Sequence, residues 1–258
     1  MDQILEIDTE DMMVTVQCGT ALQVLEDTLR PLGFTTGHSP QSKPIAQMGG
    51  LVSTRSIGQF STLYGAIEDM VVGLEAVFPG GRIVRVKNVP RRAAGPDIRH
   101  VVIGNEGALA YITEVTVKLF PWVPDTTRYF GFLVPNFGDA IAMLREIVTA
   151  GYRPSVARAY SPEDARQHFP DHPMDQNLVV LTAEGPAPLV EATSRAIEEM
   201  AAGVAHTRVP DGDIRRWFEA LNWGPEKIEA EKKTMLETAH LGYTTEVSVD
   251  WSRTAELY

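Results

Sequence analysis

The pattern of apolar and polar positions along this chain changes near residue 121. Before that point, alternating apolar positions predict short strands at residues 4–8 and 13–17. A helix is expected next, with Thr20 as its N-cap and Gly33 at its end. Its apolar face is predicted from leucines at helical spacing, which are Leu22, Leu25, Leu29 and Leu32.

The rest of the first part combines a long polar segment with a β-hairpin. Residues 38–47 contain two prolines, so we expect an irregular segment of the kind on which ligand contacts concentrate. The runs 71–78 and 82–87 flank a Pro-Gly-Gly turn and predict a hairpin. Residues 113–119 alternate apolar and polar side chains, which predicts a half-buried strand ending at Pro121.

Beyond residues 121–125, where we place a domain boundary, strands and helices alternate. Strands are predicted at 127–134, 155–160, 178–185 and 204–209. Helices are predicted after Asn136, after Ser161 and at 188–202. The order strand–helix–strand, repeated twice, predicts a ferredoxin-like antiparallel sheet with helices on one face.

The remaining elements are expected to complete this second domain. In the helix after Asn136, the predicted buried face consists of Phe137, Ala140, Ile141, Leu144 and Val148, and Gly151 ends the helix. Two amphipathic helices should follow the last predicted strand of the sheet, the second from Pro225. We expect a final strand at 242–249 and a helix start at Asp250.

Composition and charge exclude several classes of protein. The 258 residues carry a net charge of −11, which disfavours nucleic acid as a partner because its phosphates would be repelled. The single cysteine, Cys18, rules out an intrachain disulfide, and we expect it to be buried in a strand. No stretch approaches the roughly 20 apolar residues that span a membrane, and no secretory signal is visible. We therefore expect a cytoplasmic protein.

Two glycine-bearing stretches, residues 38–58 and 103–121, carry most of the information about function. Both place small residues beside a polar run and then begin regular structure, which lets a backbone approach a flat or anionic ligand. Neither contains GxGxxG or GxxxxGK[ST], which argues against the usual NAD- and ATP-binding folds. The alternatives are a glycine-rich packing turn in the first stretch and a helix break in the second.

These stretches, with several further motifs in the same order, resemble a known family. The residues that carry the resemblance are 40–50, 54–56, 64–65, 68–69, 90–91, 95–97 and 104–107, with Arg158, 245–247 and Trp251. The chain is similar to the FAD-linked oxidoreductases of the vanillyl-alcohol oxidase type. Within that family it resembles the alkyldihydroxyacetonephosphate synthase branch over nearly its whole length.

The resemblance implies an α+β fold in two parts. Residues 1–121 would be the second half of an FAD-binding domain of the PCMH type, and residues 122–258 most of a ferredoxin-like substrate or cap domain. Family members carry a flavin-phosphate subdomain before this point and a C-terminal segment with a histidine cluster. Neither is present in this sequence, so we expect a truncated chain.

The resemblance also implies three sets of residues that contact FAD. The first set is Pro40, Gln41, Ser42, Lys43, Pro44, Ile45, Ala46, Gln47, Gly49 and Gly50. The second, expected on a short helix, is Thr54, Arg55, Ser56 and Ile57. The third, on the ribose and adenine side, is Gly104, Glu106, Gly107, Ala108, Tyr111 and Ile112. The chain departs from the family pattern at Gln47, Met48, Asn105 and Ala110, which puts local contacts there in doubt.

One candidate catalytic residue lies in the second domain. The arginine that matches Arg158 is important for activity in the synthase branch, where a cation near flavin and substrate stabilises negative charge. The alternative is an edge-strand arginine in a salt bridge. The six histidines lack metal-ligand spacing and are expected at the surface or at helix caps, so we predict no metal site.

The resemblance thus implies an FAD-dependent oxidoreductase that acts on a small molecule such as a 2-hydroxy acid. Two alternatives remain open: alkyl transfer on FAD without net redox change, and a non-catalytic piece of the family. Because a truncated piece exposes apolar surface, we also expect self-association, most simply as a homo-oligomer.

Overall fold

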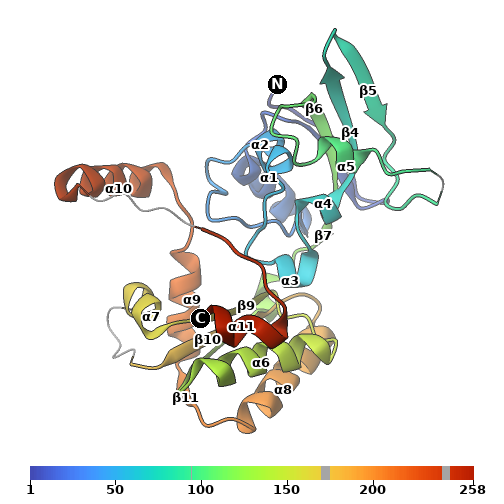
Figure 1. Cartoon of the computed structure of the whole chain (residues 1–258). Helices are drawn as coiled ribbons and strands as arrows, with labels where there is room; N and C mark the ends of the chain where they lie inside the picture. The colour runs from blue at the N-terminus through green and yellow to red at the C-terminus, as the bar shows by residue number, and fades with distance from the viewer. Residues whose placement is uncertain (94, 170–174, 240–244) are drawn as a thin grey trace. The chain divides into compact units, whose positions relative to one another are not determined.

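The chain divides into two compact units (Figure 1). The computed structural model describes residues 1–93, 95–169, 175–239 and 245–258. The first unit consists of Met1–Trp122 and Asn222–Lys227, and the second of Val123–Leu221 and Ile228–Tyr258. Both contain antiparallel sheets and helices, so the fold class is α+β as the sequence indicated.

The first unit is built on a five-stranded antiparallel sheet with the order β1-β2-β6-β4-β5. The strands are β1 (Ile4–Asp8), β2 (Met13–Gln17), β4 (Val71–Phe78), β5 (Arg82–Val86) and β6 (Tyr111–Lys118). Val16, Val115 and Leu74 are aligned across three strands and contribute to the buried core. Their neighbours Thr15 and Thr116 lie on the other face, where their hydroxyls are 2.8 Å apart. One face of the sheet is therefore apolar and the other polar.

Short helices cover the apolar face. They include α1 (Leu22–Leu29), α2 (Met48–Ser53) and α4 (Ile67–Met70), whose buried side chains join the same core as the strands. The other elements of this unit are η1 (Arg30–Leu32), β3 (Phe34–Thr35), α3 (Ser61–Tyr64), α5 (Arg99–Val102) and β7 (Phe120–Pro121). The predicted hairpin is confirmed, because β4 and β5 pair on either side of the glycine turn.

Two local predictions in this unit are wrong by about one residue. The N-cap of α1 is Ala21, not Thr20, because the Thr20 hydroxyl turns towards the carbonyl of Gln3 at 3.4 Å. Cys18 is buried but follows β2 instead of lying within it. Gly33 does end the helical segment, with a left-handed φ of 85° after η1.

The second unit is a four-stranded antiparallel sheet with the order β11-β8-β10-β9. Its strands are β8 (Arg128–Val134), β9 (Val156–Tyr160), β10 (Asn177–Ala183) and β11 (Thr207–Val209). Its helices are η2 (Pro124–Thr126), α6 (Phe137–Thr149), α7 (Pro162–His168), α8 (Ala187–Ala202) and α9 (Asp211–Glu219). Numbered from β8 the strand order is 4-1-3-2, which is the ferredoxin-like order that the sequence predicts.

Helices cover both faces of this sheet, not one. Phe130, Phe132 and Val134 of β8 pack in one core with α6 and α8. Gly131 points to the opposite face, where Ile214 of α9 lies so close that an added Cβ would be 2.5 Å from its Cδ1. The prediction of helices on one face therefore holds for α6 and α8 and misses α9.

The caps in this unit follow the prediction, whereas the buried face of α6 follows it only at Ala140 and Leu144. The Asn136 side chain accepts a hydrogen bond from the Asp139 amide at 2.8 Å, and the Ser161 hydroxyl accepts one from the Asp164 amide at 3.2 Å. The helix α6 buries Met143 and Ile147 with Ala140 and Leu144, while Val148 is exposed.

The C-terminal region departs from the expected final strand. Residues 245–250 have no regular secondary structure, and 242–244 lie outside the described residues. Before them is α10 (Pro225–Thr238), and after them η3 (Trp251–Arg253) and α11 (Thr254–Leu257). Asp250 occupies the predicted cap position, although its side chain makes no capping hydrogen bond.

Candidate functional site

The polar segment after β3 is irregular, as expected, but both of its ends are held by α1. Glu26 is 1% exposed and accepts hydrogen bonds from the Thr35 hydroxyl at 2.9 Å and from the Thr36 amide and hydroxyl at 2.9 and 2.6 Å. Arg30 lies 3.3 Å from the same carboxylate. At the far end, the Leu22 amide donates to the carbonyl of Ala46. This buried carboxylate was not singled out from the sequence, where Glu26 is one of two neighbouring acidic residues on a helix.

The side chains of this segment differ in how far solvent or a ligand can reach them. Pro40 and Lys43 are buried, and burial followed by the nearby Arg30 lowers the pKa of Lys43. Gln41, Ser42, Pro44 and Ala46 are half-buried. Ile45 and Gln47 are exposed and available for direct contact.

Gly49 and Gly50 in α2 have separate physical roles. A Cβ added to Gly49 would lie 2.7 Å from the Cβ of Cys18, so this glycine lets α2 pack against the end of β2. A Cβ at Gly50 would meet nothing within 4 Å, and Gly50 is exposed. The packing explanation therefore applies to Gly49, while Gly50 leaves main chain open at the surface.

The second set of residues lies just past α2, not on a helix. Thr54 is the C-cap, and Arg55 has a left-handed φ of 52°. The Arg55 guanidinium donates to Glu68 at 3.1 Å, while half of the arginine side chain remains exposed. Ile57 beside it is 57% exposed.

Ser56 connects this set to a buried histidine. Its hydroxyl is 3.2 Å from Nε2 of His38, which is 2% exposed. Burial lowers the pKa of His38 to about 4, so the imidazole is neutral at pH 7. The sequence-based expectation of surface or capping histidines is wrong for His38, because the chain folds over a ring that no local pattern marks as buried.

The third set meets the second through the main chain. The Gly104 amide donates to the carbonyl of Val52 at 3.0 Å, and the Glu106 amide donates to that of Ser53 at 3.1 Å. Gly104 must lack a side chain, because an added Cβ would lie 2.5 Å from Cγ of Arg55. Two segments fifty residues apart thus form one surface.

This surface concentrates left-handed backbone. Gly104, Glu106 and Gly107 have φ values of 81°, 48° and 82°, beside Arg55. Such conformations are held by their surroundings and gather at ligand sites. Gly107, Ala108 and Tyr111 are exposed, Tyr111 by 75%, whereas the Ile112 side chain lies in the core, so only its main chain is open to a ligand.

The arrangement fits a large flat ligand that carries phosphates. Gly50 and Gly107 offer open main chain, Arg55 offers a partly exposed guanidinium, and Tyr111 offers an exposed ring. The described residues contain no group of three or more His, Cys, Asp or Glu side chains that could hold a metal ion. Nor does any helix of the described part have the length and apolar character to cross a membrane.

Comparison with known proteins agrees with this chemistry. Residues 1–87 match the family of FAD binding domains. The chain is 55% identical over its whole length to YgcU of Escherichia coli strain K12, an uncharacterized FAD-linked oxidoreductase, and covers 54% of that protein. The chain is therefore similar to FAD-linked oxidoreductases, and its first 87 residues match an FAD binding domain. It spans about half the length of this relative.

The chain is also similar to two further proteins. A solved structure of alkyldihydroxyacetonephosphate synthase is 28% identical with a TM-score of 0.73, covering 92% of this chain and 44% of that one. The glycolate oxidase subunit GlcD of Bacillus subtilis strain 168 is 33% identical over 60% of this chain and 33% of its own length. FAD as the cofactor and the resemblance to the synthase branch are therefore confirmed.

The candidate catalytic residue lies on edge strand β9 of the second unit. Arg158 donates to the Tyr160 hydroxyl at 3.1 Å, and no carboxylate among the described residues forms an ion pair with it. The Tyr160 ring meets Trp217 edge-on with centroids 5.9 Å apart, and burial raises the pKa of Tyr160. Tyr160 was missed from the sequence, although its position two residues after Arg158 on a strand was the available signal.

Proposed function

We propose that the first unit contributes an FAD-binding surface to an FAD-dependent oxidoreductase, and that the second unit contributes the substrate side. The carrying observation is the pair of main-chain hydrogen bonds that joins Val52 and Ser53 to Gly104 and Glu106. They bring the two glycine-bearing stretches into one exposed surface within and beyond the matched FAD binding domain.

Each part of this surface has a defined role in the proposal. The open main chain at Gly50 and Gly107 lets the ligand approach closely, and Arg55 meets a phosphate or the edge of the ring system. Glu26 fixes Thr35 and Thr36, which lead directly into the segment 38–47. Bound FAD supplies the electron-accepting chemistry, and the chain's share is to bind and orient it.

In the second unit we propose that Arg158 stabilises negative charge on a small organic substrate. Its bond to Tyr160 and the absence of an ion pair among the described residues leave its charge uncompensated. The likeness to the glycolate oxidase subunit supports a 2-hydroxy acid or a similar alcohol as the substrate.

Alkyl transfer on FAD is a second candidate, because the alkyldihydroxyacetonephosphate synthase structure covers nearly all of this chain. Anaerobic addition of glycolate or lactate to the FAD-loaded chain separates the two. Bleaching of the flavin band supports the oxidoreductase, since the substrate must give up electrons. Alkyl transfer involves no net redox change, so it predicts a retained, unbleached flavin.

The first experiment is a visible absorption spectrum of the purified chain after addition of FAD and desalting. We expect a retained flavin band in the parent chain and in Gly138→Val, an equivalent change at an exposed helix start in the second unit. Gly50→Val should fold normally, because a Cβ meets nothing within 4 Å, yet lose the band. Loss of the band in the parent chain would contradict binding by these residues alone, and retention in Gly50→Val would remove Gly50 from the site.

Self-association is also a proposal. Edge strand β5 exposes Ile83 by 60%, and an open edge with an apolar side chain favours pairing with a second chain. Light scattering on a size-exclusion column that gives the mass of a monomer would contradict it.

A further inference from the structure

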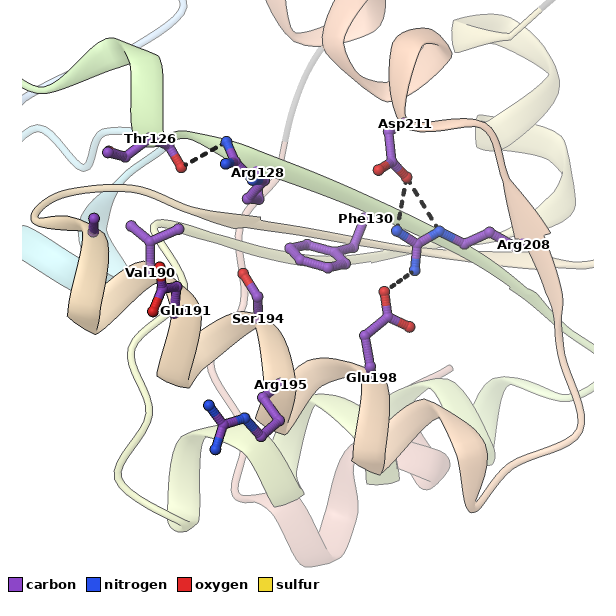
Figure 2. Close-up of a pocket in the computed structure, with 11 residues that line it drawn as sticks. Thr126, Arg128, Phe130, Val190, Glu191, Ser194, Arg195, Glu198, Arg208 and Asp211 are labelled. Atoms are coloured by element: carbon purple, nitrogen blue, oxygen red, sulfur yellow. Dashed lines mark hydrogen bonds and ion pairs between the residues drawn. The ribbon is translucent and has the colours of Figure 1, made fainter.

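The second unit contains a cavity of about 530 Å³ on the sheet face opposite Arg158 (Figure 2). Arg158 is aligned with Val180 and through it with Gly131, whereas the cavity is lined by Phe130 on the other face of β8. Helix α8 supplies most of the remaining lining, with Thr126 of η2, Arg208 of β11 and Asp211 at the start of α9. The cavity is therefore separate from the proposed substrate side.

One wall of the cavity is held in place by hydrogen bonds between its own side chains, before any ligand binds. Arg208 donates to Glu198 at 2.9 Å and to Asp211 at 2.7 Å, and its guanidinium lies 5.0 Å from the centre of the Phe130 ring. Figure 2 shows the guanidinium held between the two carboxylates beside that ring. Glu198 and Asp211 are thus engaged by a cation, and the wall presents a flat aromatic surface.

Two other polar side chains at the cavity, Arg128 and Ser194, have no charged partner among the described residues. One nitrogen of Arg128 donates to the carbonyls of Thr126 and Thr127, each at 3.1 Å, which fixes the side chain without neutralising it. The Ser194 hydroxyl is buried and has no hydrogen-bond partner in the described part of the chain.

The unpaired charges at the cavity favour an anion. Arg128 and Arg195 form no ion pair with any described residue, and neither does Glu191. The cavity lining therefore contains two cations without an ion pair, Arg128 and Arg195, and one acid without an ion pair, Glu191. Phe130 and Val190 add apolar surface. The volume lies within the range of roughly 300–1,000 Å³ that is typical of small-molecule sites.

We propose that this cavity binds a small organic anion whose apolar body lies against Phe130 and Val190. The anionic group accepts hydrogen bonds from Arg128, and the Ser194 hydroxyl gains the partner that it lacks. The cavity lies within the second unit, on the other sheet face from Arg158, so it is a second ligand site of that unit.

Binding is tested on the full chain with 4-fluorobenzoate as the probe, followed by the width of its ¹⁹F NMR line. We expect saturable binding, and at least about tenfold weaker binding by Arg128→Gln, because a charge-assisted hydrogen bond is lost. Arg153→Gln is the matched control, since it removes the same charge from an exposed position away from the cavity. Arg128→Lys should recover part of the affinity if Arg128 acts through its charge.

Two more probes distinguish the chemistry of the ligand. Neutral 4-fluorobenzamide should bind at least about fivefold more weakly than the benzoate, and Ser194→Ala should weaken both. Tighter binding of 4-fluorophenyl phosphate would assign the anionic group as a phosphate, and tighter benzoate binding as a carboxylate. Absence of saturable binding by either anion, equal binding of the benzamide, or an equal loss in Arg153→Gln would overturn the proposal.

Discussion

Buried polar side chains hold the proposed FAD surface of the first unit in place, whereas exposed polar side chains line the cavity of the second unit. In the first unit, the Glu26 carboxylate that anchors the segment 38–47 is 1% exposed, and His38 is 2% exposed. In the second unit, the Glu198 and Asp211 side chains that hold Arg208 are 54% and 58% exposed. The first site is an irregular main-chain surface, and the second is a cavity between a sheet and a helix.

The difference shows where each site draws its rigidity. An irregular segment lacks the repeating hydrogen bonds of a helix or sheet, so buried side chains must satisfy its main chain. A cavity walled by β8 and α8 already has a rigid frame, and exposed ion pairs around it add little to stability. Polar substitutions should therefore damage the first site much more than the second.

The largest effect is expected for Glu26→Ala. Removal of the carboxylate leaves Thr35, the Thr36 amide and Arg30 without their acceptor, so the free energy of unfolding should fall by about 3–5 kcal/mol. Urea unfolding measures this loss. Asp27→Ala, at the exposed neighbouring position, is the control and should change stability by about 0.5 kcal/mol or less. Equal effects of the two changes would contradict a buried anchor.

A smaller, pH-dependent effect is expected from His38. Its folded pKa of about 4 lies below the ordinary value of 6.5, so between these pH values the unfolded chain binds a proton that the folded chain does not. Stability should therefore fall as the pH is lowered from 6.5 to 4, by at most about 3 kcal/mol from this group.

Thermal unfolding across this pH range checks the His38 prediction. The variant His38→Gln should show a shallower dependence on pH, and at pH 7 it should lose stability only through lost packing. His206→Gln, at an exposed position in the second unit, should keep the parent slope. An unchanged slope in His38→Gln would show that the buried imidazole is not the group responsible.

The smallest effect is expected for Glu198→Gln. Arg208 keeps Asp211 as a partner, and the pair that is lost is exposed, so the free energy of unfolding should change by less than about 1 kcal/mol. Chemical denaturation is again the measurement. A loss as large as that of Glu26→Ala would contradict the conclusion that the exposed ion pairs at the cavity contribute little to stability.

Much of the architecture could be predicted from the sequence because its signals are local. The hairpin between β4 and β5 follows from its glycine turn, and the starts of α6 and α7 follow from Asn136 and Ser161. The three proposed FAD-contact sets could be named through the family resemblance, but the sequence did not distinguish Gly49, which is needed for packing, from Gly50, which is open.

What the sequence by itself determined is the order and type of most elements, the ferredoxin-like alternation and the resemblance to the FAD-linked family. Only the tertiary structure decided which apolar stripe of α6 is buried, because Met143 and Ile147 compete with Ile141 and Val148 and the sheet selects between them. It also decided that Glu26 and His38 are buried and that Ser53 meets Glu106. Burial and long-range hydrogen bonds depend on segments far apart along the chain, so no local pattern contains them.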